Sequence, residues 1–233
     1  MEKNLHVKFM DLGLIDYAEA WEYQKQVFDK TLEAKQKNLT TENHLLFCEH
    51  PHVFTLGKSG NRQNLLVDDR WLEDKDIPCY QTDRGGDITY HGPGQLVGYP
   101  IFDVDNFNIS VKEFVFDIET VLIRTIKHFG LHGERLERAT GVWIDAGIKG
   151  KERKIAAIGM RIHNKVSMHG FALNVNTNLD YFNYINPCGF QDKGVTSLQK
   201  ELNHKIDMVK VKQLLIKEFE IIFEAEITAK TER

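Results

Sequence analysis

A run of special residues at positions 84–95 limits the possible folds of this chain more than any other feature. The segment reads Arg-Gly-Gly-Asp-Ile-Thr-Tyr-His-Gly-Pro-Gly-Gln and lies between two strand-like segments. Glycine permits positive φ and close approach of the backbone, whereas proline fixes φ. A simple connection between strands needs only about two residues. The segment therefore predicts a tightly shaped backbone surface with exposed N–H groups, which suits a ligand better than a turn.

The composition predicts a globular protein that works in a reducing compartment. Hydrophobic residues make up 42% of the 233 positions, so the chain can bury a substantial core. The formal net charge is −4, whereas nucleic-acid-binding proteins are usually basic, so the composition does not favour that class. The 3 cysteines, an odd number, favour free thiols. Because we find no apolar signal segment and no run of about 18 apolar residues, we expect a cytoplasmic protein with no membrane or nucleic-acid partner.

Three segments have the apolar spacing of amphipathic helices: 16–36, 110–129 and 207–224. Strand-like runs lie at 44–48, 53–56, 95–102, 141–145, 154–163 and 165–175. The last two runs flank Asn164 and indicate a hairpin. Together these elements predict one α+β domain over residues 1–233, with helices packed on a mixed sheet. They also allow the last ~40 residues to form a small C-terminal appendage.

Cys188 and Lys154 are the first candidates for chemistry. Cys188 lies between a proline and a glycine, which places its thiol on a sharp loop, although a cysteine without a role is an equally good interpretation. An ordinary thiol, with a pKa of about 8.5, needs a nearby cation to become a thiolate. A desolvated Lys154 would supply that charge and carry protons, whereas a solvated lysine would not. His91 and His169 are alternative bases, or structural histidines.

A metal or nucleotide site finds little support in the sequence. Cys48, His50 and His52 alternate in the way that metal ligands on one face of a strand would. However, Pro51 interrupts the strand and no second Cys/His cluster completes a tetrahedral set, so we expect no metal. Neither the phosphate-binding loop nor the dinucleotide-binding glycine motif occurs.

Several ordered motifs resemble the lipoyl(octanoyl) transferase family. Segment 84–95, followed by Leu-Val-Gly-Tyr-Pro, is similar to the family signature. The other matching segments are 49–51, 54–57, 141–143, 154–159, 169–175, 187–189 and 195–198. Several motifs in order are far more specific than one. The resemblance implies an α+β fold like that of the biotin and lipoate protein ligase catalytic domains, with a mixed β-sheet and packed helices.

The resemblance also implies roles for individual residues. Cys188 would be the nucleophile that forms an acyl thioester, and Lys154 would lower its pKa. The acyl-substrate site would be lined by Arg84, Gly85, Gly86, Asp87, Ile88, Thr89, Tyr90, His91, Ala157, Ile158, Gly159, Gly170, Phe171 and Ala172. His52 and the charged loop 145–153 depart from the family pattern, and neither touches the proposed chemistry.

The activity that the resemblance implies is transfer of an octanoyl or lipoyl group from acyl carrier protein. The acceptor would be a lysine in the lipoyl domains of 2-oxoacid dehydrogenase complexes or in the glycine cleavage H protein. Since a thioester is exchanged for a thioester and then for a more stable amide, we expect no ATP, metal or other cofactor.

The carrier is acidic, so Arg84, Lys149, Lys151 and Arg153 are candidate docking cations. Two alternatives stay open on the sequence. One is an ATP-dependent lipoate or biotin protein ligase of the same fold, and the other is a non-catalytic acyl- or carrier-binding module.

Overall fold

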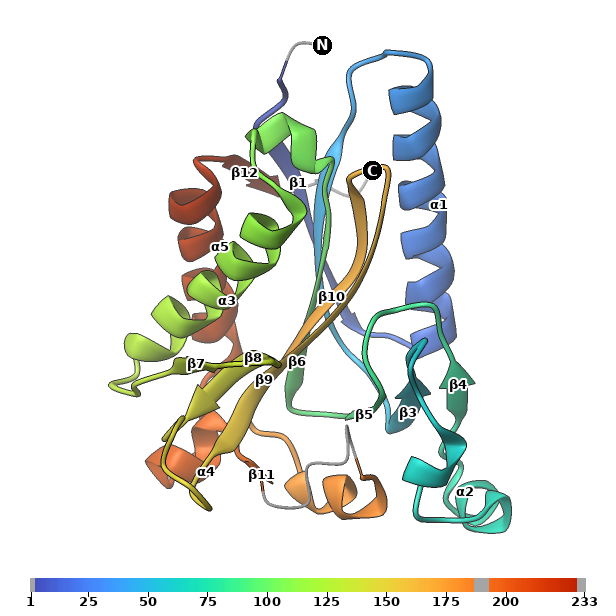
Figure 1. The fold of residues 1–233 in the computed structure, drawn as a ribbon, viewed down its shortest axis with the longest axis vertical. Coiled ribbons are helices and arrows are strands. Elements are labelled where there is room, and N and C mark those ends of the chain that lie inside the picture. Colours follow the sequence, from blue (N-terminus) through green and yellow to red (C-terminus); the bar gives the residue numbers. More distant parts are fainter. Residues whose placement is uncertain (1–2, 187–192, 230–233) are drawn as a thin grey trace.

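A computed structural model describes residues 3–186 and 193–229, and in it a large twisted sheet lies between helices (Figure 1). Its strands are β1 (His6–Leu14), β2 (Asn43–Glu49), β6 (Gln95–Ile101), β7 (Glu134–Leu136), β8 (Ala139–Ile144), β9 (Arg153–His163), β10 (Val166–Asn174), β11 (Gly194–Val195) and β12 (Glu226–Ala229). Eight of them follow the order β12-β1-β2-β6-β10-β9-β8-β7, and β11 pairs with β9. Strand β1 runs parallel to both of its neighbours, β12 and β2. The remaining pairs along this order, from β2–β6 to β8–β7, are antiparallel, so the sheet is mixed, as predicted.

The central hairpin of the sheet confirms the prediction made from Asn164. Strands β9 and β10 pair from Val166↔His163 onward, and the two turn residues Asn164 and Lys165 have φ of 47° and 61°. Two successive positive φ values are typical of the type I′ turn, whose twist matches that of the flanking strands.

Helices cover both faces of the sheet, with α1 (Tyr17–Gln36) on one face and α3 (Val111–Lys127) and α5 (Met208–Phe223) on the other (Figure 1). All three predicted helices are confirmed. The side chain of Ser110 caps α3, and Glu113 returns the bond in a capping box. None of the helices in the described ranges combines the length and apolar character needed to cross a membrane.

The prediction of a separate C-terminal appendage is wrong. Val211, Leu215 and Phe219 of α5 are fully buried in the same core as the α3 side chains Phe114 and Ile118. Strand β12 then pairs with β1 at the sheet edge, and the short helix α4 (Leu198–Leu202) buries Leu198 in the same core. The C-terminal elements therefore complete one layer of the fold.

A smaller sheet lies beside the main one, at the lower right of Figure 1, and positions the 84–95 segment. It has the order β4-β3-β5, with β3 (Val53–Leu56), β4 (Cys79–Gln81) and β5 (Ile88–His91). Helix α2 (Asp69–Lys75) and the 3₁₀ turns η1 (Arg62–Asn64) and η3 (Leu179–Tyr184) pack nearby, whereas η2 (Val104–Phe107) follows β6. Strands β1, β4, β5, β7, β11 and β12 and helices α2 and α4 were not predicted.

Candidate active site

Strand β5 divides the special segment between two environments. Successive side chains of a strand point to opposite faces. Ile88 and Tyr90 enter an apolar cluster with Phe54 and Leu72, whereas Thr89 and His91 face a cavity between β5 and the main sheet. The predicted residues Ile88 and Tyr90 therefore support the site from behind and do not line it.

This cavity, which we call the glycine-walled pocket, has a volume of about 50 Å³. It is lined by Tyr17, Arg84, Thr89, His91, Val97, Tyr99, Ala157, Ile158, Gly159, His169, Gly170, Phe171 and Ala172. Nine of the predicted substrate-binding residues come together here from three separate segments: Arg84, Thr89, His91, Ala157, Ile158, Gly159, Gly170, Phe171 and Ala172. The predicted residues Gly85, Gly86 and Asp87 do not line the pocket.

Close backbone contacts explain the glycines of the pocket wall. A Cβ atom on Gly170 would lie 2.0 Å from the carbonyl oxygen of Gly98, and one on Gly159 would lie 2.8 Å from the carbonyl oxygen of Gly85. The N–H of Gly85 also donates to the carbonyl of Met160 at 2.9 Å. The 84–86 backbone is therefore held directly on β9, and Gly86, with φ of 89°, makes the turn that follows.

Arg84 holds this loop from inside. Its guanidinium is buried and donates to the carbonyls of Thr55 and Asp87, each at 2.7 Å, and to the carbonyl of Gly85 at 3.0 Å. The carboxylate of Asp87 in turn accepts from the Asn64 side chain at 2.6 Å. The prediction that Arg84 is a docking cation on the surface is wrong, because its guanidinium is buried and hydrogen-bonds to backbone oxygens.

Neutral rings form one wall of the pocket. Tyr17 stacks on His91 with ring centroids 5.9 Å apart, and His91 Nδ1 donates to the Gln95 side chain at 2.7 Å. Burial lowers the pKa of His91 to about 3 and raises the pKa of Tyr17. Both groups are therefore uncharged at neutral pH, and His91 is a poor candidate for a general base.

His169 is likewise a neutral group at the pocket, paired outward to Asp83. Its Nε2 lies 2.6 Å from the Asp83 carboxylate, which also binds Arg161. Burial lowers the pKa of His169, whereas the hydrogen bond from His169 lowers the pKa of Asp83 to about 2. His169 also has φ of 59°, a conformation that non-glycine residues seldom adopt. The geometry favours a structural role for this histidine.

A β-bulge turns Lys154 toward the pocket side of the sheet. Val142 of β8 pairs with Ala156, but Trp143 pairs with Lys154, so one residue of β9, Ile155, is extra. Ile155 and Ala156 both enter the core beneath α3 and α5. The shift in alternation places Lys154 on the opposite face, which is the face of Ala157 and Gly159.

Cys188 lies outside the described residues, but the chain on both sides of it is anchored. Before it, the Asn186 N–H donates to the Asn64 carbonyl at 2.7 Å. After it, Val195 pairs with Lys154 in β11, and the Thr196 N–H donates to the Lys154 carbonyl at 3.0 Å. Cys188 is thus six positions in sequence from a strand that pairs beside Lys154.

Of the alternating residues, Cys48 and His50 are in contact, with Sγ 3.4 Å from Nε2, whereas His52 contacts the Tyr90 hydroxyl. β2 ends before His50, whose Nε2 lies 2.7 Å from the Tyr99 hydroxyl, whereas His52 stacks on Tyr181 with ring centroids 4.2 Å apart. Within residues 3–186 and 193–229, no three Cys, His, Asp or Glu side chains are grouped as metal ligands.

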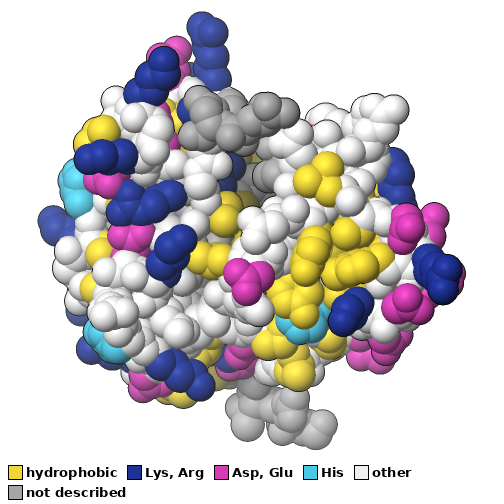
Figure 2. Space-filling model, turned by 90° about the horizontal axis from the view of Figure 1, so that it is seen from below, with side chains coloured by type: hydrophobic (Ala, Val, Ile, Leu, Met, Phe, Trp, Pro, Cys, Tyr) yellow, Lys and Arg dark blue, Asp and Glu magenta, His cyan; other side chains and the backbone are white. Residues whose placement is uncertain are grey.

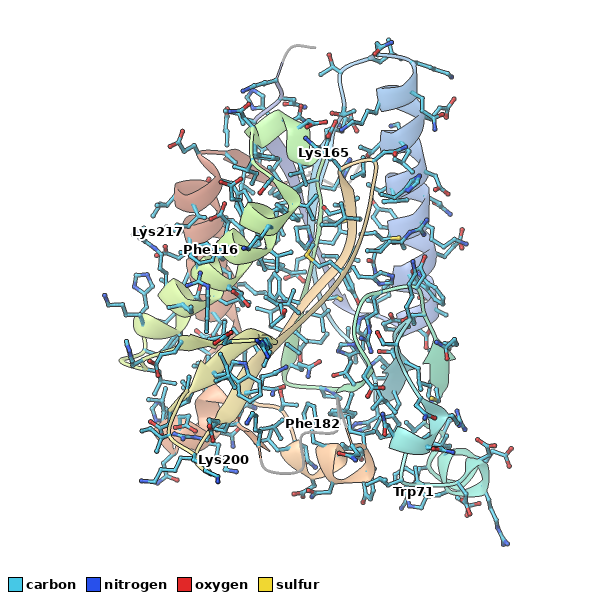
Figure 3. All side chains as sticks on the ribbon, viewed as in Figure 1. Trp71, Phe116, Lys165, Phe182, Lys200 and Lys217 are labelled. Carbon is cyan, nitrogen blue, oxygen red and sulfur yellow. The ribbon has the colours of Figure 1, made fainter. Side chains whose placement is uncertain are left out.

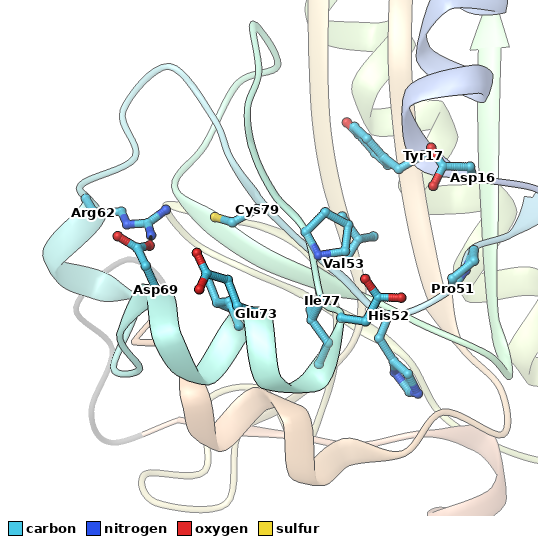
Figure 4. Close-up of a pocket in the computed structure, with 13 residues that line it drawn as sticks. Asp16, Tyr17, Pro51, His52, Val53, Arg62, Asp69, Glu73, Ile77 and Cys79 are labelled. Atoms are coloured by element: carbon cyan, nitrogen blue, oxygen red, sulfur yellow. Dashed lines mark hydrogen bonds and ion pairs between the residues drawn. The ribbon is translucent and has the colours of Figure 1, made fainter.

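A second hollow of about 620 Å³ lies between α2 and the start of α1 (Figure 4). Tyr17 lines both this acidic hollow and the glycine-walled pocket. Asp16, Asp69, Glu73 and Asp76 line the hollow, against the cation of Arg62, which pairs with Asp69. The carboxylates outnumber the cation, so the hollow is unfavourable for a phosphate group.

Sequence reasoning missed Tyr17, Val97 and Tyr99 as lining residues. Val97 and Tyr99 belong to a predicted strand and alternate along it, so their shared face was a usable signal. Tyr17 gave no such signal, because it reads as the first apolar residue of an amphipathic helix. Only the packing of α1 on the sheet brings it to the pocket.

Comparisons with known proteins agree with this geometry. Residues 16–220 match the model of the lipoyl protein ligase A/B catalytic domain, and the chain belongs to this family. An octanoyltransferase of Bacteroides fragilis is 53% identical over 89% of this chain and 94% of its own length. An octanoyltransferase of Cytophaga hutchinsonii is 47% identical over 97% of both chains. The predicted family of acyltransferase enzymes is confirmed.

Solved structures confirm the predicted fold. The bipartite lipoate protein ligase of Thermoplasma acidophilum aligns with a TM-score of 0.73 at 16% identity, covering 99% of this chain and 88% of that one. The biotin protein ligase of Aquifex aeolicus aligns with a TM-score of 0.51 at 10% identity, covering 93% of this chain and 70% of that one. At such identities the likeness concerns the fold alone.

Proposed function

We propose that this protein transfers an octanoyl group from acyl carrier protein to a lysine of a lipoyl domain, through a thioester on Cys188. The observation that carries the proposal is that Lys154 and the small pocket-lining residues Ala157 and Gly159 share one face of β9. Lys154 thus leaves the sheet on the same side as the glycine-walled pocket. The names of the relatives support the octanoyl group.

In the first step, the Cys188 thiolate attacks the carbonyl carbon of the octanoyl thioester. A new S–C bond forms, the bond to the carrier sulfur breaks, and Lys154 gives a proton to the departing thiolate. The acyl chain lies between Ala157, Ala172 and Phe171. The carrier's phosphate approaches from the side away from the acidic hollow, where Lys149 and Lys151 are exposed.

In the second step, the acceptor lysine attacks the thioester carbon on Cys188. The C–N bond forms, the C–S bond breaks, and the proton lost by the amine returns to Lys154. The acyl donor and the acceptor use the same pocket in turn, which predicts ping-pong kinetics. Acceptors would be the lipoyl domains of 2-oxoacid dehydrogenase complexes and the glycine cleavage H protein.

Intact-mass spectrometry tests the nucleophile. After incubation with octanoyl-carrier, the wild type should gain one octanoyl group, and Cys188→Ala should gain none. Cys79→Ala and Cys48→Ala are matched controls. Burial raises the pKa of both of these thiols, so neither thiol should carry the octanoyl group and both variants should still gain it. An adduct that persists in Cys188→Ala would remove Cys188 from this role.

Two further assays separate the alternatives. Exchange of pyrophosphate into ATP, dependent on octanoate or lipoate, would identify a ligase. Tight carrier binding without transfer would identify a binding module. Lys154→Ala should slow acylation and move thiol alkylation by iodoacetamide to higher pH, whereas Lys217→Ala, at an exposed position of α5, should do neither. Identical alkylation profiles for wild type and Lys154→Ala would contradict the role of Lys154.

A further inference from the structure

The side chain of Lys154 rests on an aromatic face. Its Nζ lies 4.7 Å from the ring centroid of Trp143, within the range of cation–π attraction. The two residues are register partners across β8 and β9, so their side chains leave the sheet on the same face. Nζ also donates to the carbonyl of Thr140 at 3.2 Å.

The indole is held rigidly. Trp143 is only 2% exposed, and its Nε1–H donates to the carbonyl of Ala139 at 2.8 Å. Because burial and this bond restrain the ring, holding the lysine against its electron-rich face costs little further conformational entropy.

The strand next to the indole makes room for the lysine stem. A Cβ atom on Gly141 would lie 2.5 Å from the carbonyl oxygen of Ala156, and 3.4 and 3.5 Å from Lys154 Cε and Cδ. Gly141 also has φ of 127°, and its N–H donates to the buried carboxylate of Glu119 at 2.9 Å. Residues 139–143 of β8 therefore form a seat for the whole Lys154 side chain.

We propose that Trp143 is a positioning residue for Lys154: its indole face holds the ammonium group on the pocket side of β9. The catalytic consequence rests on the proposed function, in which Lys154 moves protons for the thioester chemistry. The charged side chains of the neighbouring elements include Arg153, which pairs with Asp145 and Glu201 at 2.5 and 2.6 Å, and Arg135, which pairs with Glu119 at 2.8 Å.

The matched variants Trp143→Phe and Trp143→Leu separate aromatic attraction from packing. Both lose the hydrogen bond to Ala139 and both leave a smaller side chain, but only phenylalanine keeps a π face. NMR of ¹³C-labelled lysine, assigned with Lys154→Met, follows the titration of Lys154 directly. Trp143→Leu should lower its titration midpoint by about 0.4 to 1.5 pH units, and Trp143→Phe should retain most of the wild-type value. Equal midpoints in the two variants would overturn the proposal.

The pH profile of octanoyl transfer supplies a second readout. If Lys154 acts as proposed, the profile of Trp143→Leu shifts with its NMR midpoint and that of Trp143→Phe does not. Different midpoints with identical activity profiles would support the aromatic seat and count against the catalytic role of Lys154.

A measurement that leaves Trp143 in place guards against unstable variants. In a Trp21→Phe, Trp71→Phe background, Trp143 is the remaining tryptophan, and its emission maximum reports the nearby charge. Lys154→Met should shift this maximum, whereas the exposed Lys151→Met should leave it unchanged. An unshifted maximum in Lys154→Met would refute the contact.

Discussion

Replacement of Arg84 by methionine should destabilise the whole fold. Methionine keeps an unbranched stem of similar length but removes all five donors of the guanidinium. The wild-type group makes its shortest bonds to the carbonyls of Thr55 and Asp87, and these join β3 to the loop before β5. Hydrogen bonds to charged groups contribute about 1.5–3 kcal/mol each, so losing these two should lower the free energy of unfolding by about 3–6 kcal/mol.

Urea unfolding followed by far-UV circular dichroism measures this loss. With an m-value of about 3 kcal/mol/M, the expected change is a fall in the midpoint of about 1–2 M urea. The exposed Arg70→Met controls for the loss of a charge, and Arg84→Lys should recover only part of the stability, because an ammonium cannot reach several oxygens in one plane. If Arg84→Met lost less than about 1 kcal/mol, as the Arg70 control should, the guanidinium would not be holding the loop.

Three more predictions follow from single contacts. Gly170→Ala places a Cβ 2.0 Å from a backbone oxygen of β6, whereas the Cβ of the control Gly194→Ala would have its nearest contact at 3.5 Å. Gly170→Ala should therefore have a melting temperature several degrees below that of Gly194→Ala. Equal melting temperatures would contradict the close packing of β6 and β10. Because the pKa of His91 is lowered to about 3, the unfolded chain binds a proton first as the pH falls, so stability should decline between about pH 6.5 and 3. His91→Gln should remove about 1.4 kcal/mol per pH unit of that slope in urea titrations, and an unchanged slope would refute the assignment. Cys48, which is fully buried, should react with a thiol reagent only on unfolding, whereas the half-buried Cys79 should react slowly in the native protein; native labelling of Cys48 in a Cys188→Ala, Cys79→Ala background would show that β2 opens locally.

The outline of the fold was predictable because it depends on local patterns. The period of apolar residues located α1, α3 and α5, and Asn164 between two strand-like runs marked the central hairpin. Strands β1 and β12 escaped prediction because they pair at the sheet edge and are largely exposed, so their apolar alternation is weak. Strand β5 escaped because its four residues are surrounded by glycines that read as loop.

The site was predictable from motifs, but its internal organisation was not. Arg84 reads as a surface cation, since only the folded backbone gathers the carbonyls that surround its guanidinium. The division of β5, with Thr89 toward the pocket and Ile88 away from it, needs the register of the small sheet. The bulge at Ile155 has no sequence signal of its own, and it decides where Lys154 points.

The distribution of hydrophobic and basic side chains over the lower face of the molecule also depends on tertiary structure. Seen from below, most Lys and Arg side chains gather over one half of this face, whereas hydrophobic side chains gather over the other (Figure 2). Trp71 of α2 and Phe182 of η3 lie at this end of the molecule, far along the chain from each other, and Phe116 of α3 lies well away from it (Figure 3). No single segment of the sequence encodes this separation.

The extra residue in β9 makes the position of Lys154 sensitive to insertions at this point of the strand. Inserting one amino acid between Lys154 and Ile155, with the bulge kept, would move Lys154 to the face of the hydrophobic core, while the residues from Ile155 onward kept their faces. We therefore expect insertions and deletions in related enzymes to be confined to the loops that flank β9. A change in the preferred length of the acyl chain is expected instead from substitutions of pocket residues such as Ala157 or Ala172.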